Sequence, residues 1–267
     1  MSRRIVVVGG DGSGPEVTSA AVSVLKAVDQ RFGLGLTFAE HAFGGAAIDA
    51  HGEPLPATTL EACRGADAIL LGAVGGPKWA KVAVDIRPEA GLLGLRQALS
   101  LYANVRPLKV HDALLDASPL KRERIQGTDL VVVRELTGGI YFGRKQRDGD
   151  AAIDECRYTV AEIERVTRQA AKLARLRRGR LTSVDKANVL ETSRLWRETV
   201  TRVMATEFPD VEVEHLLVDA MAMYLVSKPR EFDVIVTENL FGDVLTDEAA
   251  AIAGSLGVMP SSSPGRL

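Results

Sequence analysis

The sequence has little cysteine, little histidine and few aromatic residues. It contains 2 cysteines and 4 histidines among 267 residues, and only 5% of the residues are aromatic. Cys63 and Cys156 form no CxxC pair and no spaced framework, so nothing indicates a disulfide-stabilised secreted domain and a reducing cytoplasmic location is expected. The histidines show no metal-ligand spacing, which argues against a zinc site.

Long apolar runs and a strong charge of one sign are also absent. No run approaches the roughly 18–20 residues of a membrane span, and the apolar stretch in MSRRIVVVGG is too short for a signal peptide. The formal net charge of −2 gives the whole chain no electrostatic reason to bind nucleic acid or an anionic membrane. We therefore expect no nucleic-acid partner and no membrane partner. The hydrophobic content of 46% is enough for a large core in one or two domains.

Short apolar runs alternate with helical patterns along the chain. The pattern predicts strands over residues 4–8, 36–41, 68–74, 130–133, 181–184, 211–217 and 234–236, and helices over residues 15–31, 58–63, 91–101, 160–176, 191–207 and 239–256. Strands that alternate with helices are typical of an α/β layered fold rich in parallel strands. Between Thr137 and Tyr158 glycine turns and aromatic residues replace the helical pattern, which predicts a hairpin arm that pairs with another chain.

The stretch FDVIVTENLFGDVLTDEAA combines a buried strand with a helix that carries two acids on one face. Asp243 and Asp247 are four residues apart, where like charges cost roughly 0.2–0.5 kcal/mol in an isolated helix. A divalent cation would turn this repulsion into attraction. Together with Asp219, which follows another strand, these aspartates offer the oxygen ligands that Mg²⁺ or Mn²⁺ prefers. The alternative is a solvated surface pair, with Asp219 as a helix cap.

Several basic residues lie near predicted strand ends, where α/β sites assemble. Arg134 ends a buried strand in VVVRELTGG, Arg106 follows a strand-like segment in LYANVRPLK, and Arg96 lies in a predicted helix. Arginine suits bidentate binding of planar carboxylates. Lys186 follows a strand in TSVDKANVLETSR, where neighbouring groups could tune it as a base. Each of these residues could instead be an ordinary surface ion-pair partner.

The glycine-rich turn VGGDGSGPEV looks like a dinucleotide fingerprint but lacks its spacing. From Gly10 it is G-x-G-x-G, Pro15 follows directly, and no acid is clearly placed about 20 residues further on. The turn could present backbone N–H groups to an anion or cofactor. It could equally be purely structural.

Eight ordered segments together resemble the β-decarboxylating dehydrogenases, and most closely the isopropylmalate dehydrogenase family. They are GDGSGPEV, LLGAVGGPKW, RPEAGLLGLR, LYANVRP, VRELTGGIYFG, VDKANVLETSRLWR, VDAMAMYLV and FDVIVTENLFGDVLTDEAAAIAGSLG. The resemblance extends over nearly the whole chain. It implies an α/β two-domain fold with a mixed sheet flanked by helices. Residues 1–101 plus 255–267 would form a discontinuous cofactor-side domain, and residues 102–254 a second domain for substrate, metal and dimerisation, with an arm at about 137–158.

This resemblance also implies the reaction and the residues that carry it out. The implied reaction is NAD-dependent oxidative decarboxylation of (2R,3S)-3-isopropylmalate to 4-methyl-2-oxopentanoate and CO₂ in leucine biosynthesis, with Mg²⁺ or Mn²⁺. Lys186 would assist deprotonation of the C2 hydroxyl, and Tyr141 would protonate the enol. The other implied ligands are Arg96, Arg106, Arg134, Asp219, Glu89, Leu92, Leu93 and Val189 for substrate, Gly75, Gly76, Pro77, Glu89 and Asn188 for cofactor, and Asp219, Asp243 and Asp247 for metal.

In this family two subunits of a homodimer share each site. The resemblance assigns Lys186, Asn188, Val189 and Asp219 to the partner chain. Leu92 and Leu93 favour an aliphatic substrate tail over the third carboxylate of isocitrate, which would be costly to bury unpaired. Tartrate and homoisocitrate relatives are harder to separate, since one methylene discriminates by only about 1–3 kcal/mol.

The resemblance stops at GVMPSSSPGRL, where the family continues with further residues that complete the first domain and supply the adenosine pocket. The expected first domain is therefore incomplete on its C-terminal side, and the choice between NAD and NADP stays open. The alternative function is a catalytically impaired remnant that dimerises or binds ligand without turnover.

Overall fold

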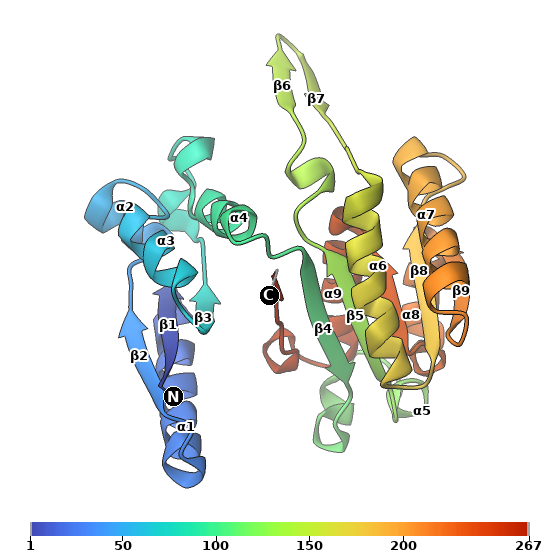
Figure 1. Ribbon diagram of the computed structural model, residues 1–267, viewed down its shortest axis with the longest axis horizontal. Coiled ribbons are helices and arrows are strands. Elements are labelled where there is room, and N and C mark those ends of the chain that lie inside the picture. The colour runs from blue at the N-terminus through green and yellow to red at the C-terminus, as the bar shows by residue number, and fades with distance from the viewer. Residues whose placement is uncertain (1, 266–267) are drawn as a thin grey trace. The chain divides into compact units, whose positions relative to one another are not determined.

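A computed structural model describes residues 2–265, which form two compact units divided between Leu99 and Ser100 (Figure 1). From the sequence we predicted that residues 255–267 join the first unit. In the structure the described part of this segment, through residue 265, belongs instead to the second unit. The backbones of Val105 and Ser262 are paired there by hydrogen bonds of 2.8 and 3.0 Å, because the segment lies along the free edge of an outer strand.

The first unit is built on a three-stranded parallel sheet of order β2-β1-β3. Its strands are β1 (Arg3–Gly10), β2 (Leu36–Glu40) and β3 (Ala68–Ala73), and its helices are α1 (Gly14–Phe32), α2 (Gly45–His51), α3 (Ala57–Arg64) and α4 (Pro88–Ala98), with 3₁₀ turns η1 (Pro77–Trp79) and η2 (Val84–Ile86). Val6 and Val8 of the central strand are fully buried. In contrast, β3 lies at an edge of the sheet and none of its residues is buried, although most of them are apolar.

The glycine-rich turn between β1 and α1 is shaped by close backbone packing. A β-carbon at Gly10 would lie 2.0 Å from the carbonyl oxygen of Ala73, and one at Gly14 would lie 2.1 Å from that of Gly9. Only glycine allows the turn to approach β3 this closely. The structure therefore gives these two glycines a packing role.

The second unit contains a mixed five-stranded sheet of order β4-β5-β10-β8-β9, as the resemblance implied. Only β4 runs antiparallel to its neighbour; the other pairs are parallel. The strands are β4 (Ala103–Lys109), β5 (Asp129–Glu135), β8 (Arg180–Asp185), β9 (Glu212–Leu217) and β10 (Val234–Thr237), and the helices are α5 (Arg122–Ile125), α6 (Val160–Arg175), α7 (Glu191–Glu207), α8 (Val218–Ser227) and α9 (Asn239–Ile252). Short 3₁₀ turns fill the connections: η3 (Asp112–Ala117), η4 (Gly139–Tyr141), η5 (Pro229–Glu231) and η6 (Leu256–Val258).

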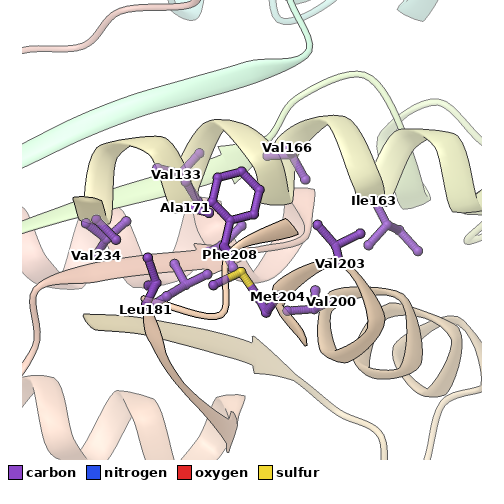
Figure 2. Packing of buried hydrophobic residues seen from close by; sticks show 14 of the residues in the cluster. Val133, Ile163, Val166, Ala171, Leu181, Val200, Val203, Met204, Phe208 and Val234 are labelled. Atoms are coloured by element: carbon purple, nitrogen blue, oxygen red, sulfur yellow. The ribbon is translucent and has the colours of Figure 1, made fainter. Parts of the chain in front are cut away.

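Alternate side chains of the strands fill two apolar layers, one on each face of this sheet. On one face Val133, Leu181 and Val234 pack against α6 and α7, with Phe208 closing the layer (Figure 2). On the other face Val132 and Ile235 pack with residues of α8 and α9. Both faces are thus covered, so a site for a ligand has to lie at an end of the strands.

The helix ends follow local sequence signals. Thr159 and Glu162 form a reciprocal capping box at the start of α6, and α7 spans the residues predicted for it. Helix α4 begins at Pro88, three residues before the predicted start, because proline is well suited to the first turn. Helix α9 ends at Ile252, before the predicted residue 256, and Gly254 follows with a φ of 89°.

The predicted hairpin arm is present as β6 (Lys145–Asp148) paired antiparallel with β7 (Ala151–Asp154). Every residue of both strands is exposed. No helix among residues 2–265 is long and apolar enough to cross a membrane.

Candidate active site

The second-unit residues that the sequence singled out lie at or near the carboxyl ends of the four parallel strands, where α/β sites assemble. Arg134 is the penultimate residue of β5, and Lys186 directly follows β8. Asp219 lies in the first turn of α8 after β9, and Asp243 lies on α9 after β10. The fold therefore brings residues from distant parts of the sequence to the carboxyl-terminal end of one sheet.

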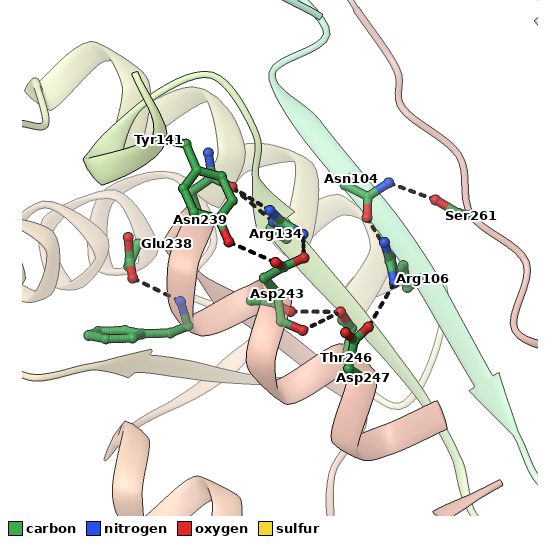
Figure 3. Close-up of polar contacts among 12 residues, drawn as sticks. Asn104, Arg106, Arg134, Tyr141, Glu238, Asn239, Asp243, Thr246, Asp247 and Ser261 are labelled. Atoms are coloured by element: carbon green, nitrogen blue, oxygen red, sulfur yellow. Dashed lines mark hydrogen bonds and ion pairs between the residues drawn. The ribbon is translucent and has the colours of Figure 1, made fainter. Parts of the chain in front are cut away.

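Arg134, Tyr141 and Asp243 form a single network (Figure 3). Nη1 of Arg134 donates to Oδ1 of Asp243, and the Tyr141 hydroxyl donates to Oδ2 of Asp243 at 2.7 Å. The Arg134 side chain is only 2% exposed. A β-carbon at Gly242 would lie 2.6 Å from Cγ of Arg134, so the arginine crosses α9 where this helix has no side chain.

Arg106 joins the same site from the neighbouring strand. It lies in the middle of β4, not after a strand as predicted, because the strand continues through Pro107 to Lys109. Its Nη1 is 3.7 Å from Oδ1 of Asp247. Two arginines therefore face the two aspartates of α9.

Burial and neighbouring charge shift the pKa values of this cluster. Burial, followed by the nearby charge of Arg134, lowers the pKa of Arg106 below its ordinary value, while the aspartates oppose the shift. Burial and then the hydrogen bond to Asp243 raise the pKa of Tyr141 to about 12. Tyr141 is consequently a protonated hydrogen-bond donor at neutral pH.

Lys186 and Asp219 form a second cluster at the same edge of the sheet. Nζ of Lys186 lies 2.9 Å from Oδ2 of Asp219. The hydrogen bond from Lys186 lowers the pKa of the Asp219 carboxyl. Asn188 and Val189 lie in the following turn, and both are exposed, with Val189 at 59%.

The strand order separates the two clusters within one chain. Neighbouring strands are roughly 4.8 Å apart, so β9 lies roughly 10 Å from β10, the strand that leads into α9. Accordingly, among the described residues no group of three His, Cys, Asp or Glu side chains is close enough to hold a metal ion. Asp243 and Asp247 offer the oxygen donors that fit Mg²⁺ or Mn²⁺, whereas Asp219 is paired with Lys186.

The first-unit residues that the resemblance assigned to substrate and cofactor lie on α4 and on the loop after β3. Leu92 and Leu93 are half-buried on α4, Arg96 is on the same helix, and Glu89 is exposed in its first turn. Gly75, Gly76 and Pro77 lie in the loop and the start of η1. A β-carbon at Gly75 would lie 2.6 Å from Oε1 of Glu89, so the predicted cofactor loop and this acid are neighbours.

Asp11 anchors this loop, a role that we did not predict. Its buried carboxylate accepts hydrogen bonds of 2.8 Å from the backbone nitrogens of Gly45, Ala46 and Gly75. The aspartate thus ties the start of α2 to the loop after β3. The one sequence feature that could have indicated this role is the position of Asp11 inside the glycine-rich turn VGGDGSGPEV.

Two asparagines beside the arginines were also missed. Asn104 contacts Arg106, and Asn239 contacts Arg134. Both asparagines lie inside segments already singled out, LYANVRPLK and VTENLFGD. Nothing in their local pattern indicates burial, which follows only from the packing of the sheet and α9.

Comparison with known proteins gives consistent similarities. Residues 4–266 match the sequence family of isocitrate/isopropylmalate dehydrogenases. A 3-isopropylmalate dehydrogenase of Rhodopirellula baltica is 55% identical over 269 residues, covering 99% of this chain and 75% of the relative. The 3-isopropylmalate dehydrogenase of Bacillus subtilis is 55% identical over 269 residues, covering 98% of this chain and 73% of that relative.

Solved structures are also similar over nearly the whole of this chain. The isocitrate dehydrogenase from Methylococcus capsulatus has a TM-score of 0.82 at 35% identity, covering 98% of this chain and 74% of that one. A β-decarboxylating dehydrogenase from Thermococcus kodakarensis has a TM-score of 0.77 at 37% identity, covering 99% of this chain and 72% of that one. This chain spans about three quarters of the length of the relatives named here.

Proposed function

The chain belongs to the isocitrate/isopropylmalate dehydrogenase family, and on that premise we propose that it catalyses the NAD-dependent oxidative decarboxylation of 3-isopropylmalate, as in leucine biosynthesis. The observation that carries this proposal is the network of two arginines, two aspartates and a protonated tyrosine at one edge of the sheet. It combines groups for binding an anionic hydroxy acid, ligating a divalent cation and donating a proton. The free cysteines Cys63 and Cys156 suit a cytoplasmic enzyme.

Substrate recognition would rest on guanidinium groups and an apolar pocket. We assign Arg96, Arg106 and Arg134 to the carboxylates, since arginine suits bidentate contacts with planar anions. Burial and then the proximity of Arg134 lower the pKa of Arg106. Two guanidinium groups that close together suit the binding of a negative ligand. Leu92 and Leu93, with Glu89 and Val189, would surround the isopropyl group.

Two proton-transfer roles follow from the chemistry of the chain's own side chains. Lys186 would assist deprotonation of the C2 hydroxyl, and its 2.9 Å contact with Asp219 keeps it beside a proposed metal ligand. Tyr141 would donate a proton to carbon after CO₂ leaves. A phenol carries its proton at neutral pH, which that role requires.

The cofactor assignments rest on donor chemistry. Asp243, Asp247 and Asp219 would hold Mg²⁺ or Mn²⁺, and Gly75, Gly76, Pro77, Glu89 and Asn188 would contact NAD. When bound, the nicotinamide accepts hydride from C2, and the divalent cation stabilises negative charge that develops on the substrate oxygens. The carboxylates of α9 fit the cation, since they are oxygen ligands on one helix face with side chains 38% and 64% exposed.

A homodimer would complete each site. One chain holds the two clusters apart, so Lys186, Asn188, Val189 and Asp219 of a second copy would meet the Arg134–Asp243 cluster of the first. Exposed apolar side chains on the packed helices α8 and α9 support such an interface, namely Met223, Val226 and Val244. The exposed β6–β7 arm would add a second contact.

Mixed dimers test both the reaction and the shared site. Asp243→Asn and Lys186→Met each disable one half of the site, so each variant alone should lose 3-isopropylmalate-dependent NADH formation. If the halves come from different subunits, co-folded 1:1 mixtures regain one intact site in each mixed dimer, which predicts about a quarter of the parental rate. A mixture as inactive as its components would contradict sharing, and an inactive parent enzyme would contradict the reaction itself.

A further inference from the structure

Each arginine of the second-unit cluster is held at its inner edge by a buried asparagine (Figure 3). Nε of Arg106 donates to Oδ1 of Asn104 at 2.8 Å. Nε and Nη2 of Arg134 donate to Oδ1 of Asn239 at 2.9 and 2.7 Å. Asn104 is 1% exposed and Asn239 is fully buried. The same arrangement thus occurs twice, from two unrelated parts of the fold.

The far side of each amide is also fixed. Nδ2 of Asn239 donates to the carbonyl oxygen of Gly138 at 3.0 Å. Nδ2 of Asn104 donates to the hydroxyl of Ser261 at 2.8 Å, with Ser262 O and Ser263 Oγ at 3.2 and 3.1 Å. Guanidinium groups only donate hydrogen bonds, so the amide oxygens must face the arginines. Each asparagine therefore has one orientation.

Charge distinguishes the two edges of each guanidinium. The inner edge meets an uncharged amide, whereas the outer nitrogen Nη1 meets a carboxylate: Asp243 for Arg134 and Asp247 for Arg106. A second carboxylate, at the inner edge, would add to Asp243 or Asp247 and make the surroundings of the arginine net negative. An amide holds the guanidinium plane by hydrogen bonds and leaves its full positive charge for groups at the outer edge.

We propose that Asn104 and Asn239 are positioning residues that fix the orientation of Arg106 and Arg134 while preserving their charge for an anionic ligand. This inference rests on the proposed function for the identity of that ligand, a dicarboxylate. The contacts within the protein stand independently of it. Neither asparagine needs to touch the substrate.

The first arm of the test needs no substrate. In ¹H–¹⁵N spectra of the arginine Nε–H groups, we expect the resonances of Arg106 and Arg134 to be protected from exchange. Asn104→Ala should remove the protection of Arg106, and Asn239→Ala that of Arg134. Arg177 and Arg197, whose Nε groups donate to Asp233 and Asp185, should stay protected in both variants. Thr167→Val is the matched control, since Thr167 is fully buried and loses a 2.7 Å hydrogen bond to Ile163 O on α6. Unchanged protection of the Arg106 resonance in Asn104→Ala and of the Arg134 resonance in Asn239→Ala would overturn the proposal.

The second arm measures charge preservation by kinetics. Asn104→Asp keeps an oxygen beside Nε of Arg106, and the hydroxyls of Ser261 and Ser263 can rotate to donate to it. The added charge should raise KM for 3-isopropylmalate about tenfold or more, with KM for NAD⁺ unchanged. Gln126→Glu, the same amide-to-acid change at an exposed position, should alter neither constant.

Two further outcomes separate this inference from the proposed function. A wild-type KM for 3-isopropylmalate in Asn104→Asp, or an equal rise in both KM values, would overturn the positioning role. A parent enzyme without turnover would count against the proposed function alone, because the spectra of the arginine Nε–H groups still decide whether the asparagines hold them.

Discussion

The hydroxyl of Tyr141 donates a 2.7 Å hydrogen bond to Oδ2 of Asp243, whose other oxygen accepts Nη1 of Arg134. One half-buried carboxylate therefore serves a neutral donor and a buried cation at the same time. This connects proposed proton donation, charge balance and the proposed metal site through a single side chain, and the first two predictions below follow from that coupling.

Tyr141 should make unfolding sensitive to pH in the alkaline range. Its pKa is raised to about 12 in the folded protein, above the ordinary value of about 10. The folded state thus favours the protonated phenol, so this stabilisation is complete below about pH 10 and is lost as the pH rises towards 12. The free energy of unfolding, measured by urea titration, should fall less between about pH 10 and pH 12 for Tyr141→Phe than for the parent protein. An identical pH profile would contradict the prediction, and Tyr224→Phe, on α8, is the control.

Asp243→Asn should abolish metal-dependent turnover without changing the fold. Asparagine keeps one oxygen to accept from Arg134, and its amide nitrogen can donate to the Tyr141 hydroxyl, which then accepts. It removes the charge that a divalent cation requires, so we expect a loss of about a hundredfold or more in kcat. Steady-state rates over a Mg²⁺ or Mn²⁺ titration measure the loss, and far-UV circular dichroism checks the fold. Asp116→Asn removes an exposed acid that pairs only with Arg122 among the described contacts and should leave the rate unchanged. A variant that keeps its metal dependence would show that the pair is a surface feature.

Leu93→Ala should weaken selection for the isopropyl group. Removing buried methylene groups costs about 0.8 kcal/mol each, and pockets of this kind discriminate by about 10–200-fold. The ratio of kcat/KM for 3-isopropylmalate to that for malate should fall accordingly. Val24→Ala, at a 64% exposed position of α1, is the matched control. Equal losses for both substrates would contradict the assignment of Leu93 to the pocket.

Met223→Glu should dissociate the proposed homodimer and abolish activity with it. Met223 is 64% exposed on α8, and a glutamate in an apolar interface would be buried without a partner. Analytical ultracentrifugation should show monomers with unchanged helix content. Val24→Glu alters an equally exposed apolar residue of the first unit and should remain dimeric and active. A dimeric, active Met223→Glu variant would place the interface elsewhere.

Much of the second unit could be predicted because its signals are local. The apolar runs of β8 and β10 and the helical period of α7 predict those elements nearly to the residue. The four-residue spacing places Asp243 and Asp247 on one helix face whatever surrounds them. Two predicted boundaries differ from the structure. Helix α4 starts earlier, at Pro88, because proline suits the first turn, and β4 extends past Arg106 because it pairs with β5 as far as Lys109.

The sequence by itself determined the α/β architecture, the family and the set of residues that meet at the carboxyl ends of the strands. Only the tertiary structure decided their partners: Lys186 with Asp219, Arg134 with Asp243, and an asparagine behind each of two arginines. The physical reason is that periodicity and strand ends are encoded locally. In contrast, the strand order β4-β5-β10-β8-β9 comes from packing between segments far apart in the chain, and it sets every distance between these groups.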